Sequence, residues 1–499
     1  MAPLAPLVSG RIPFHSLFFV AILVFSLIVY NLHVLIPNHN FAPVRILSMR
    51  FALSALFTLI VATSVSFSQS APPYERTSFI NDLLKDVSAS KIEEYDRKLV
   101  SFGTRNTNSS QDDPNRGIGA ARDWIYSEFK RISEACGGCL DVRLQTYLQE
   151  PRNRVPKAVN ITNVIAELKG TSDPSRVYVV SGHYDSMCSD SADGECDAPG
   201  ANDDASGTSA VIEMARVMSK KRYDATIIFM AVAGEEQGLL GATHFAEEAK
   251  KAAMNIEAMI TNDIIGGVKT FKDRPDRNTV RVFAEGVPSN ETEREAGLRR
   301  SVGGENDSAA RQLGRYIKET ADLYSPDFKV NLIYRRDRYL RGGDHIPFLE
   351  RGYPAVRFTE PHEDYTHQHQ NVRTEDGVFY GDTPEFIDFG YIANVTRVNI
   401  AALASMALAP PIPKDAGIVL ARLTNDTDLK WAASPAEDIA GYEIVWRETT
   451  APFWTNSKFV GDVTSFTMDE MSKDNWFFGV RAVDKDGYRS PVAYPRPTR

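Results

Sequence analysis

The hydrophobic pattern divides the chain into regions of different character. Between residues 176 and 261, short apolar runs alternate with segments in which apolar positions recur every three or four residues. This alternation is typical of an α/β domain with a mainly parallel, mixed sheet flanked by helices. The segments that carry it are Val177–Ser181, Thr208–Met218, Thr226–Val232, Leu239–Ala249 and Glu257–Thr261.

Helical periodicity also occurs on both sides of this region. Apolar positions recur at helical spacing over Ser78–Ser101, Ala120–Ile132 and Tyr391–Ala407. We therefore assign residues 72–150 to a helical N-terminal part, within which a removable pro-segment is an open alternative. Residues 151–408 are assigned to the α/β domain.

The C-terminal region has a different pattern. A proline cluster at residues 409–413 ends the helical periodicity and predicts a linker. Residues 414–499 show only strand-like alternation, and four of the five tryptophans lie there. With Trp431 as an early core residue and Tyr442–Trp446 and Phe478–Ala482 as paired strands, this pattern resembles a fibronectin type III module. A separately folded C-terminal β-sandwich is therefore expected.

Two apolar segments near the N-terminus have the features of export signals. Residues 17–35 are long and apolar enough to cross a bilayer as a helix. A second apolar run follows Met49 and ends in small residues, which is the pattern of a secretory signal peptide. Because two such signals in tandem are redundant, residues 1–48 are either a membrane anchor or an overextended gene model, and residues 49–71 are the signal peptide. Both interpretations predict a catalytic domain that is secreted or anchored outside the cytosol.

Composition and charge narrow the class of protein. With 43% hydrophobic and 24% charged residues over 499 positions, the chain has the composition of a soluble globular protein of more than one domain. The formal net charge of −9, without a dense Lys/Arg block, argues against a nucleic-acid binder.

Sequons and cysteines agree with a secretory compartment. The six N-x-[ST] sequons, which are candidate glycosylation sites, begin at Asn108, Asn160, Asn290, Asn306, Asn394 and Asn425. The four cysteines form two close pairs, Cys136/Cys139 and Cys188/Cys196, which predict local disulfides. A zinc or redox role for the CGGC segment is the weaker alternative, since no second C-x-x-C accompanies it.

Acidic and histidine residues follow the predicted strands at the points where they end. In open α/β sheets, ligands bind at the carboxyl ends of the strands. The residues placed there are His183 and Asp185, Glu235 and Glu236, and Asp263, joined by Asp203 from the loop before a helix and by His367 and His369 from a late loop.

Each of these residues also has an ordinary structural interpretation. A lone histidine is more often a hydrogen-bonded structural residue, and an Asp-Asp pair before a helix is usually an N-cap. The combination favours a metal site, because nitrogen and oxygen ligands with a spare carboxylate suit zinc and a general base. Adjacent Glu235 and Glu236 would repel one another in a cleft without a cation.

Six motifs, in this order and spacing, resemble the M28 family of zinc peptidases. They are GHYDS, PGANDDASGTSAVIEMAR, AGEEQGLLGATHFA, TNDIIG, GGDHIPFLERGYPAV and YTHQHQ, and the resemblance covers residues 155–405. It implies a phosphorylase/hydrolase-like α/β fold, two co-catalytic zinc ions and hydrolysis of peptide bonds at a free chain end.

The resemblance also implies a role for individual residues. His183 and Asp263 would bind one zinc ion and Glu236 the other, with Asp203 as the bridge between them. Asp204 would form the unusual peptide bond that presents this bridge.

Two further carboxylates complete the implied machinery. Glu235 would stay uncoordinated as general base and acid, and Asp185 would orient the His183 ring through its carboxylate. Asp344 and His345 are expected to line the pocket or support the ligands without binding metal.

The late loop offers two histidines for the second zinc ion. The family places this ligand four residues before an acidic or amide residue, which favours His367, four residues before Asn371, over His369. Several relatives carry a tyrosine directly before the ligand, whereas Thr366 stands there in this chain and Tyr365 lies one residue earlier. An oxyanion role for Tyr365 is therefore not assigned.

The expected function is that of a di-zinc aminopeptidase acting on peptides with a free N-terminus through a water held between the metals. A glutaminyl cyclase on the same fold, with a single zinc ion, is one alternative, which the NDDASG motif and the C-terminal module disfavour. A catalytically inactive binding ectodomain is another, which the intact Glu235 and ligand set disfavour. Carboxypeptidase specificity, side-chain preference and oligomeric state are left open.

Overall fold

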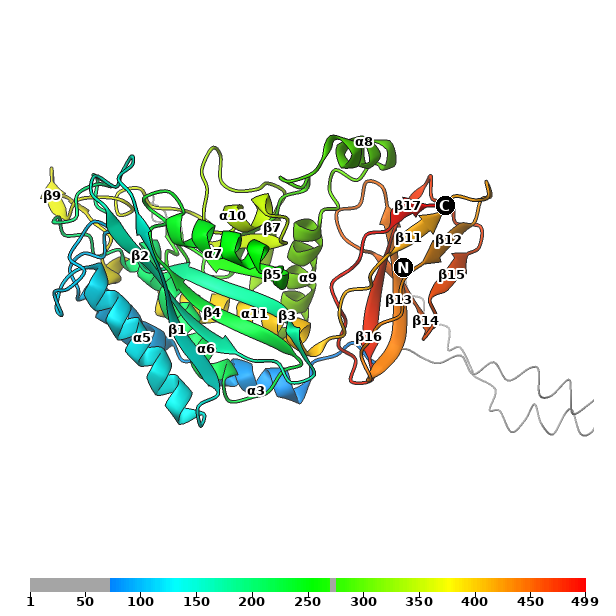
Figure 1. Cartoon of the computed structure of the whole chain (residues 1–499), viewed down its shortest axis with the longest axis horizontal. Helices are drawn as coiled ribbons and strands as arrows, with labels where there is room; N and C mark the ends of the chain where they lie inside the picture. Colours follow the sequence, from blue (N-terminus) through cyan, green and yellow to red (C-terminus); the bar gives the residue numbers. More distant parts are fainter. Residues whose placement is uncertain (1–71, 270–274) are drawn as a thin grey trace, which may run out of the picture. The chain divides into compact units, whose positions relative to one another are not determined.

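The structure is a computed structural model of the chain, and it describes residues 72–269 and 275–499. The expected anchor and signal peptide, residues 1–48 and 49–71, lie outside the described residues. The described residues belong to one compact unit. Figure 1 shows its central sheet, its surrounding helices and the C-terminal strands.

The centre of the unit is an eight-stranded mixed sheet in the order β1-β2-β4-β3-β5-β8-β6-β7. The inner strands β4, β3, β5 and β8 run parallel to one another, whereas β1, β2 and β6 each have an antiparallel neighbour. This confirms the predicted mainly parallel sheet. The strands are β1 (Leu140–Gln149), β2 (Val159–Leu168), β3 (Asp173–His183), β4 (Ala225–Val232), β5 (Asn255–Asn262), β6 (Thr279–Phe283), β7 (Lys329–Ile333) and β8 (Ala355–Thr359).

Helices cover both faces of this sheet. Successive residues of β3 enter different hydrophobic clusters, because Val179 packs with residues of α7 and Val180 with residues of α6 and α11. Burial on both faces explains why the central strands are almost uniformly apolar. The helices are α3 (Ser78–Asp86), α4 (Ala89–Val100), α5 (Ile118–Ala135), α6 (Ser206–Met218), α7 (Leu240–Lys251), α8 (Glu293–Val302), α9 (Ala309–Tyr324), α10 (Ile346–Glu350) and α11 (Phe389–Leu408), with the short turns η1 (Ala201–Ala205) and η2 (Pro384–Phe386).

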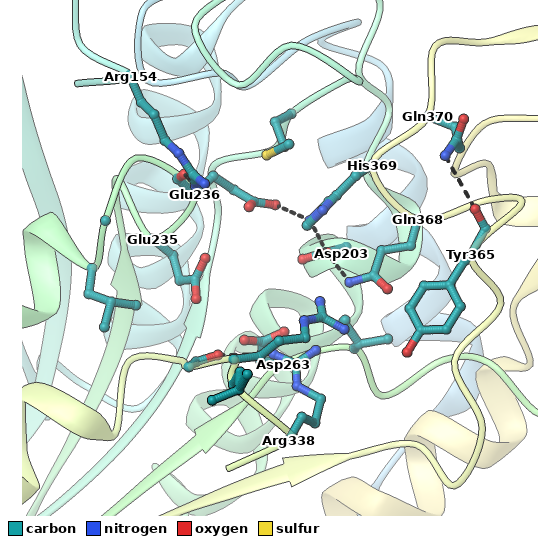
Figure 2. Close-up of a pocket in the computed structure, with 17 residues that line it drawn as sticks. Arg154, Asp203, Glu235, Glu236, Asp263, Arg338, Tyr365, Gln368, His369 and Gln370 are labelled. Atoms are coloured by element: carbon teal, nitrogen blue, oxygen red, sulfur yellow. Dashed lines mark hydrogen bonds and ion pairs between the residues drawn. The ribbon is translucent and has the colours of Figure 1, made fainter.

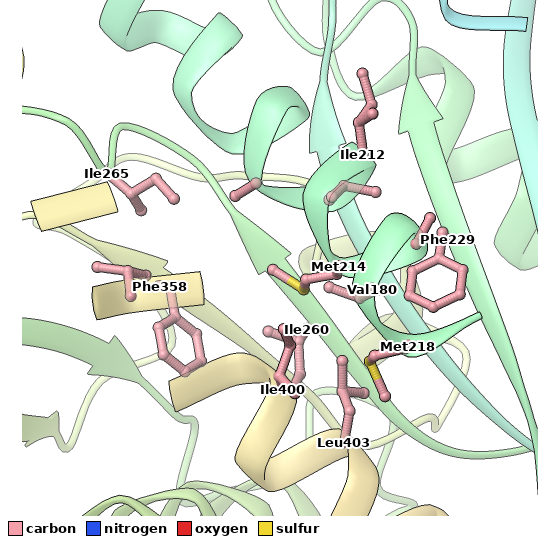
Figure 3. Close-up of a cluster of buried hydrophobic side chains, with 14 of the residues drawn as sticks. Val180, Ile212, Met214, Met218, Phe229, Ile260, Ile265, Phe358, Ile400 and Leu403 are labelled. Atoms are coloured by element: carbon pink, nitrogen blue, oxygen red, sulfur yellow. The ribbon is translucent and has the colours of Figure 1, made fainter. Parts of the chain in front are cut away.

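The larger hydrophobic cluster forms between the sheet, α6 and α11. Figure 3 shows Met214 and Met218 of α6 facing Ile400 and Leu403 of α11, next to Phe229 of β4. Among the described helices, α11 is long and apolar enough to cross a membrane by length and composition, and 83% of its apolar window is buried inside the protein. It is therefore a core helix of this fold.

The N-terminal helices belong to the same core. Ser78–Ser101, expected as one helix, is divided into α3 and α4 at Ser88. The Ser88 hydroxyl accepts the amide N–H of Lys91 at 3.3 Å, and the Ser88 amide N–H donates to the Glu213 carboxylate of α6 at 2.7 Å. This N-cap starts a new helix and ties it to the core. Ile80, Leu83 and Ile92 are buried in the larger cluster.

The C-terminal residues form two small sheets with a shared core. One has the order β15-β12-β11-β17 and the other β14-β13-β16. Leu429 and Trp431 on the first side pack with Tyr442, Ile444 and Phe478 of the second. The strands are β11 (Gly417–Val419), β12 (Thr427–Lys430), β13 (Ile439–Glu448), β14 (Asn456–Gly461), β15 (Ser465–Met468), β16 (Trp476–Asp484) and β17 (Arg496–Thr498), and the two-stranded β9 (Arg373–Glu375) and β10 (Val378–Tyr380) lie outside this region. The predicted all-β module is present, and its fibronectin type III identity stays a prediction.

The two predicted local disulfides are also present. Cys136 is bonded to Cys139 and Cys188 to Cys196, and no free cysteine occurs among the described residues. The bond between Cys136 and Cys139 leaves no free thiolate for zinc, which disfavours the zinc interpretation of CGGC.

Candidate active site

Four of the predicted site residues converge at the carboxyl ends of three adjacent parallel strands. His183 is the last residue of β3, Glu235 and Glu236 follow β4, and Asp263 follows β5. Asp203 comes from η1, the turn that leads into α6. Figure 2 shows Asp203, Glu235, Glu236 and Asp263 facing one cavity.

Asp203 stands between two histidines. Its Oδ1 lies 3.1 Å from His183 Nε2, and its Oδ2 lies 2.8 Å from His369 Nε2. Each histidine has a second carboxylate beside it, since Asp263 Oδ1 lies 3.8 Å from His183 Nε2 and Glu236 Oε1 lies 3.0 Å from His369 Nε2. The site thus consists of two sets of side chains, each with one histidine and one carboxylate, and Asp203 lies between the two sets.

The structure departs from the sequence expectation at the late histidine. It brings His369, and not the favoured His367, to Asp203 and Glu236. The His367 ring instead stacks on Phe386 with ring centroids 3.7 Å apart, and its Nε2 lies 3.9 Å from Asp364. The physical reason is the loop backbone, in which His369 adopts a left-handed φ of 55°. A single left-handed residue does not occur in a regular helix or strand, so the spacing of the two histidines in the sequence cannot show which of them faces the site.

Asp185 contacts both the His183 ring and the turn after β4. The His183 ring Nδ1 is 3.1 Å from the Asp185 main-chain carbonyl and 3.6 Å from its carboxylate. The carboxylate also accepts the amide N–H groups of Glu235 at 3.1 Å and Glu236 at 3.0 Å. Asp185 therefore positions the turn that carries the general-base candidate.

The turn that carries Asp203 is held by two buried carboxylates. The peptide bond between Asp203 and Asp204 is cis, which matches the unusual bond expected there. Asp204 accepts the amide N–H of His183 at 3.0 Å and that of Gly207 at 2.9 Å. Asp382 accepts the amide N–H of Asp203 at 2.7 Å and is 6% exposed. Asp382 was missed in the sequence because it lies in no recognised motif.

Arg357 is a second residue that sequence reasoning missed. Its guanidinium is fully buried, and its Nη2 lies 2.7 Å from Asp263 Oδ1. It lies on β8, directly beside β5 in the sheet, which brings it to the carboxylate. A charged residue inside an apolar strand motif (PAVRFT) was the available signal.

Asp344 and His345 lie within the protein next to the site. Asp344 is 1% exposed, and no described residue hydrogen-bonds to its carboxylate. Burial raises the pKa of Asp344 to about 8. His345 Nε2 lies 2.8 Å from the main-chain carbonyl of Arg336, away from the cluster of ligands. Tyr365 lines the cavity and is 64% exposed.

The negative charge of the buried carboxylates at this site would be balanced by bound metal cations. Burial, together with the charges of Asp263 and Glu236, raises the pKa of Glu235 well above its ordinary value. Burial lowers the pKa of His369, but the carboxylates of Glu236 and Asp203 outweigh it and raise that pKa to about 11. So many carboxylates in one buried place need compensating positive charge.

The donor atoms also suit zinc. The ligand atoms of His183, Asp203 and Glu236 all lie within 4.8 Å of one another. His183 Nε2 is buried and makes no hydrogen bond to a described residue, although Asp203 Oδ1 lies near it. A buried imidazole nitrogen that faces carboxylates without a hydrogen bond is a typical zinc donor.

The cluster opens into a cavity of about 820 Å³. Glu235, Glu236, Asp203, Asp263 and His369 line its floor. This volume is within the range of pockets that bind small ligands and short peptide segments.

Comparison with known proteins identifies similar chains. Residues 163–377 match the model of peptidase family M28. A protein of Pyricularia oryzae named "Probable zinc metalloprotease" is 50% identical over 420 residues, which is 83% of this chain and 84% of that protein. A protein of Leptosphaeria maculans described in the same words is 49% identical over 418 residues, covering 84% and 97% of the two chains. The LapA aminopeptidase structure of Legionella pneumophila aligns with a TM-score of 0.47 at 18% identity over 68% of this chain and 78% of that one.

Proposed function

The chain belongs to peptidase family M28 and is a zinc metalloprotease, and on this premise we propose that it is a di-zinc aminopeptidase. The observation that carries the proposal is the position of Asp203. Its two carboxylate oxygens face different histidines, His183 at 3.1 Å and His369 at 2.8 Å. A carboxylate shared in this way is suited to bridge two metal ions.

The proposed ligands form two sets around Asp203. His183 and Asp263 would hold one zinc ion, and Glu236 and His369 the other. We therefore propose His369 as the ligand in place of His367, whose ring is stacked on Phe386. The chemistry that zinc supplies when bound is polarisation of a carbonyl group and a lowered pKa of coordinated water.

The protein contributes the proton transfer and the orientation. Glu235 lines the cavity next to the ligands and is half-buried there. Its carboxylate is therefore placed to take the proton of the attacking water and to return it to the leaving amine. Asp185 holds the main chain of Glu235 through the hydrogen bond of 3.1 Å.

Hydrolysis of two matched amides tests this function. The full zinc-loaded chain should cleave leucine amide, leave N-acetyl-leucine amide intact, and contain two zinc ions per chain by elemental analysis. A chelator should abolish the activity, and added zinc should restore it. One zinc ion per chain together with cyclisation of N-terminal glutamine would contradict the proposal and favour a glutaminyl cyclase. Cleavage of N-blocked peptides from their carboxyl end would favour a carboxypeptidase.

A further inference from the structure

The wall of the cavity carries positive charge that the chemistry above does not use. The carboxylates that line the cavity are Asp203, Glu235, Glu236 and Asp263, all assigned to the metals or the proton transfer. The other charged side chains in the lining, besides His369, are three arginines: Arg154, Arg338 and Arg341. The part of the wall left for the substrate therefore consists of cationic, uncharged polar and apolar side chains, with no carboxylate among its described residues.

Arg154 is held in place by a tight turn. Arg152 and Val155 exchange main-chain hydrogen bonds of 2.8 and 3.0 Å around it, and Asn108 Nδ2 donates to the Arg154 carbonyl at 2.9 Å. Arg154 itself has a left-handed φ of 66°, which non-glycine residues rarely adopt. Backbone outliers of this kind concentrate at functional sites.

The Arg154 side chain reaches the active site from this turn. Its Nη1 donates to the main-chain carbonyl of Glu236 at 2.9 Å. Among the described residues, no carboxylate lies within ion-pair distance of its guanidinium. Figure 2 shows Arg154 beside Glu236, on the other side of the drawn site from Arg338. Arg154 is thus a cation next to a proposed metal ligand, with donor groups left over.

The rim of the cavity that carries Arg338 and Arg341 also has more positive than negative charge. Arg341 Nη1 lies 2.5 Å from Glu363, which also accepts from Arg338 at 3.1 Å and Arg281 at 3.2 Å. Arg338 also contacts Asp337 at 3.1 Å, so three guanidinium groups face two carboxylates here. Arg341 keeps 32% of its side chain exposed at this rim.

We propose that this cationic wall, with Arg154 as its unpaired member, binds a carboxylate group of the peptide substrate close to the scissile bond. Guanidinium groups form strong, charge-assisted hydrogen bonds with carboxylates, and a fork of donors favours this geometry. The carboxylate has two chemical sources: an acidic side chain next to the scissile bond, or the C-terminal carboxylate of a short peptide. Lysine and arginine side chains are disfavoured at the same place. The inference rests on the proposed aminopeptidase function and adds the substrate class.

Pairs of peptides that differ by one carboxylate test the proposal. The zinc-loaded full chain is assayed for kcat/KM on Leu-Gly against Leu-Gly amide, on Leu-Glu amide against Leu-Gln amide, and on Glu-Leu amide against Gln-Leu amide. The first pair reports the C-terminal carboxylate, and the other two report acidic side chains on either side of the bond. At least one carboxylate member should exceed its neutral partner about tenfold, as expected for one charge-assisted hydrogen bond.

Variants identify the residue responsible. Arg154→Gln should bring that ratio close to one, and Arg154→Lys should retain part of it. Arg152→Gln, at an exposed position of the same turn outside the cavity lining, is the matched control and should keep the full ratio. The ratio separates recognition from support of the Glu236 main chain, because loss of that support lowers both members of a pair equally.

Two outcomes overturn the proposal: wild-type ratios near one in all three pairs, or an Arg154→Gln variant that slows both members of each pair alike. Cleavage of N-acetyl-Leu-Glu with the same dependence on Arg154 supports carboxylate binding and refutes the aminopeptidase function. The experiment can therefore refute the carboxylate-binding proposal and the aminopeptidase proposal independently of each other.

Discussion

Glu235 is the residue whose role is most direct to test. It is adjacent to the proposed zinc ligand Glu236 and lines the same cavity, but it is not itself assigned to a metal. Glu235→Gln removes the proton carrier and keeps the shape, so we expect kcat to fall by about 10²–10⁴. Zinc content should stay unchanged, which elemental analysis of the purified variant checks. Near-normal turnover in this variant would show that another group moves the proton.

The two late histidines can be separated by the metal they retain. His369→Ala removes a nitrogen that lies 2.8 Å from Asp203, so we expect the variant to lose zinc and most of its activity. His367→Ala removes a ring stacked on Phe386 and should keep both zinc ions, at a modest cost in stability. Metal analysis after dialysis against a weak chelator makes the comparison. A larger zinc loss in His367→Ala would restore the assignment made from the sequence.

Asp484 gives the protein a pH-dependent stability. It is 1% exposed and accepts the Tyr488 amide N–H at 2.8 Å. Burial, with a contribution from the nearby carboxylates of Asp438 and Asp486, raises the pKa of Asp484 to about 7. Since the folded-state pKa lies above the unfolded value, its contribution is present below the unfolded pKa and is lost as the pH rises through 7.

The amide variant removes this dependence. Asp484→Asn keeps the acceptor oxygen without the charge, so it should be more stable than the parent at pH 8 by up to about 4 kcal/mol and equal near pH 4, because one pKa unit corresponds to about 1.4 kcal/mol. Denaturant unfolding at the two pH values measures the difference. Asp469→Asn, at an exposed position that does not contribute to the pKa of Asp484, is the control and should change little at either pH.

At the scale of elements, the loops of the active site are tied to the N-terminal helices. Arg105, between α4 and α5, is fully buried. Its guanidinium donates to the carbonyls of Tyr184 at 2.7 Å, Pro199 at 2.6 Å and Gly200 at 2.9 Å. Tyr184 follows His183, and Gly200 leads into the turn with Asp203. The segment after β3 and the turn before α6 are therefore held by one side chain.

Removal of Arg105 should disturb both loops together. Arg105→Met removes the side-chain donor from the carbonyls of Tyr184 and Pro199, whereas the Gly200 carbonyl keeps the amide N–H of Ala205 at 3.0 Å. We expect a loss of about 3 kcal/mol in stability together with weaker zinc binding. Thermal unfolding and zinc titration measure the two effects. Arg116→Met, in the same loop with 39% of its side chain exposed, is the control and should cost less than about 1 kcal/mol. An Arg105 variant with wild-type zinc affinity would show that the loops hold their positions without it.

The same packing bears on the extent of the mature chain. Helices α3, α4 and α5 contribute to the larger hydrophobic cluster, which includes Ile80, Ile92 and Phe129. Removal of residues 72–150 as a pro-segment would expose this cluster and withdraw Arg105. We therefore propose that they stay in the active enzyme.

At the scale of the whole molecule, the C-terminal sheets are joined to the α/β domain by buried charges. Asp307, just before α9, accepts from Arg315 of α9 at 2.6 Å and from Arg447 of β13 at 2.7 Å. All three side chains are less than 5% exposed. Arg481 of β16 adds a second connection through Glu319 of α9 at 2.9 Å. The proline-rich linker thus joins two parts that are also held together through their side chains.

A single substitution should loosen this connection. Arg447→Met leaves Asp307 with Arg315 and the Gln312 amide as its buried partners, and we expect a loss of about 3 kcal/mol in stability. The surface pair of Arg422 and Asp428 gives the control, since Arg422 is 74% exposed and Arg422→Met should change stability by less than about 1 kcal/mol. Chemical denaturation of both variants makes the comparison. Truncation near Pro411 should then lower the thermal stability of the remaining domain, because Asp307 would lose Arg447 and Glu319 would lose Arg481. Equal stability of the full and truncated chains would show that the two parts fold independently.

Local features of the sequence determined the fold class and most of the proposed site. Apolar runs that end in His183, Glu235, Glu236 or Asp263 are contiguous in the chain, so the pattern shows both the strand and the residue at its carboxyl end. The two disulfides followed in the same way from cysteines a few positions apart. The unusual peptide bond at Asp204 was expected from the family resemblance of its motif.

Only the tertiary structure decided the contributions that come from distant segments. The left-handed backbone at His369 turns that ring toward Asp203 and leaves His367 on Phe386. Asp382 and Arg357 reach the ligands from a loop and a strand more than ninety residues away along the chain. Periodicity and motif spacing describe neighbours in the sequence, whereas these contacts depend on how the chain crosses between strands. For the same reason, nothing in the sequence distinguishes Arg154 from an ordinary surface residue. Only the folded turn brings its charge to the cavity.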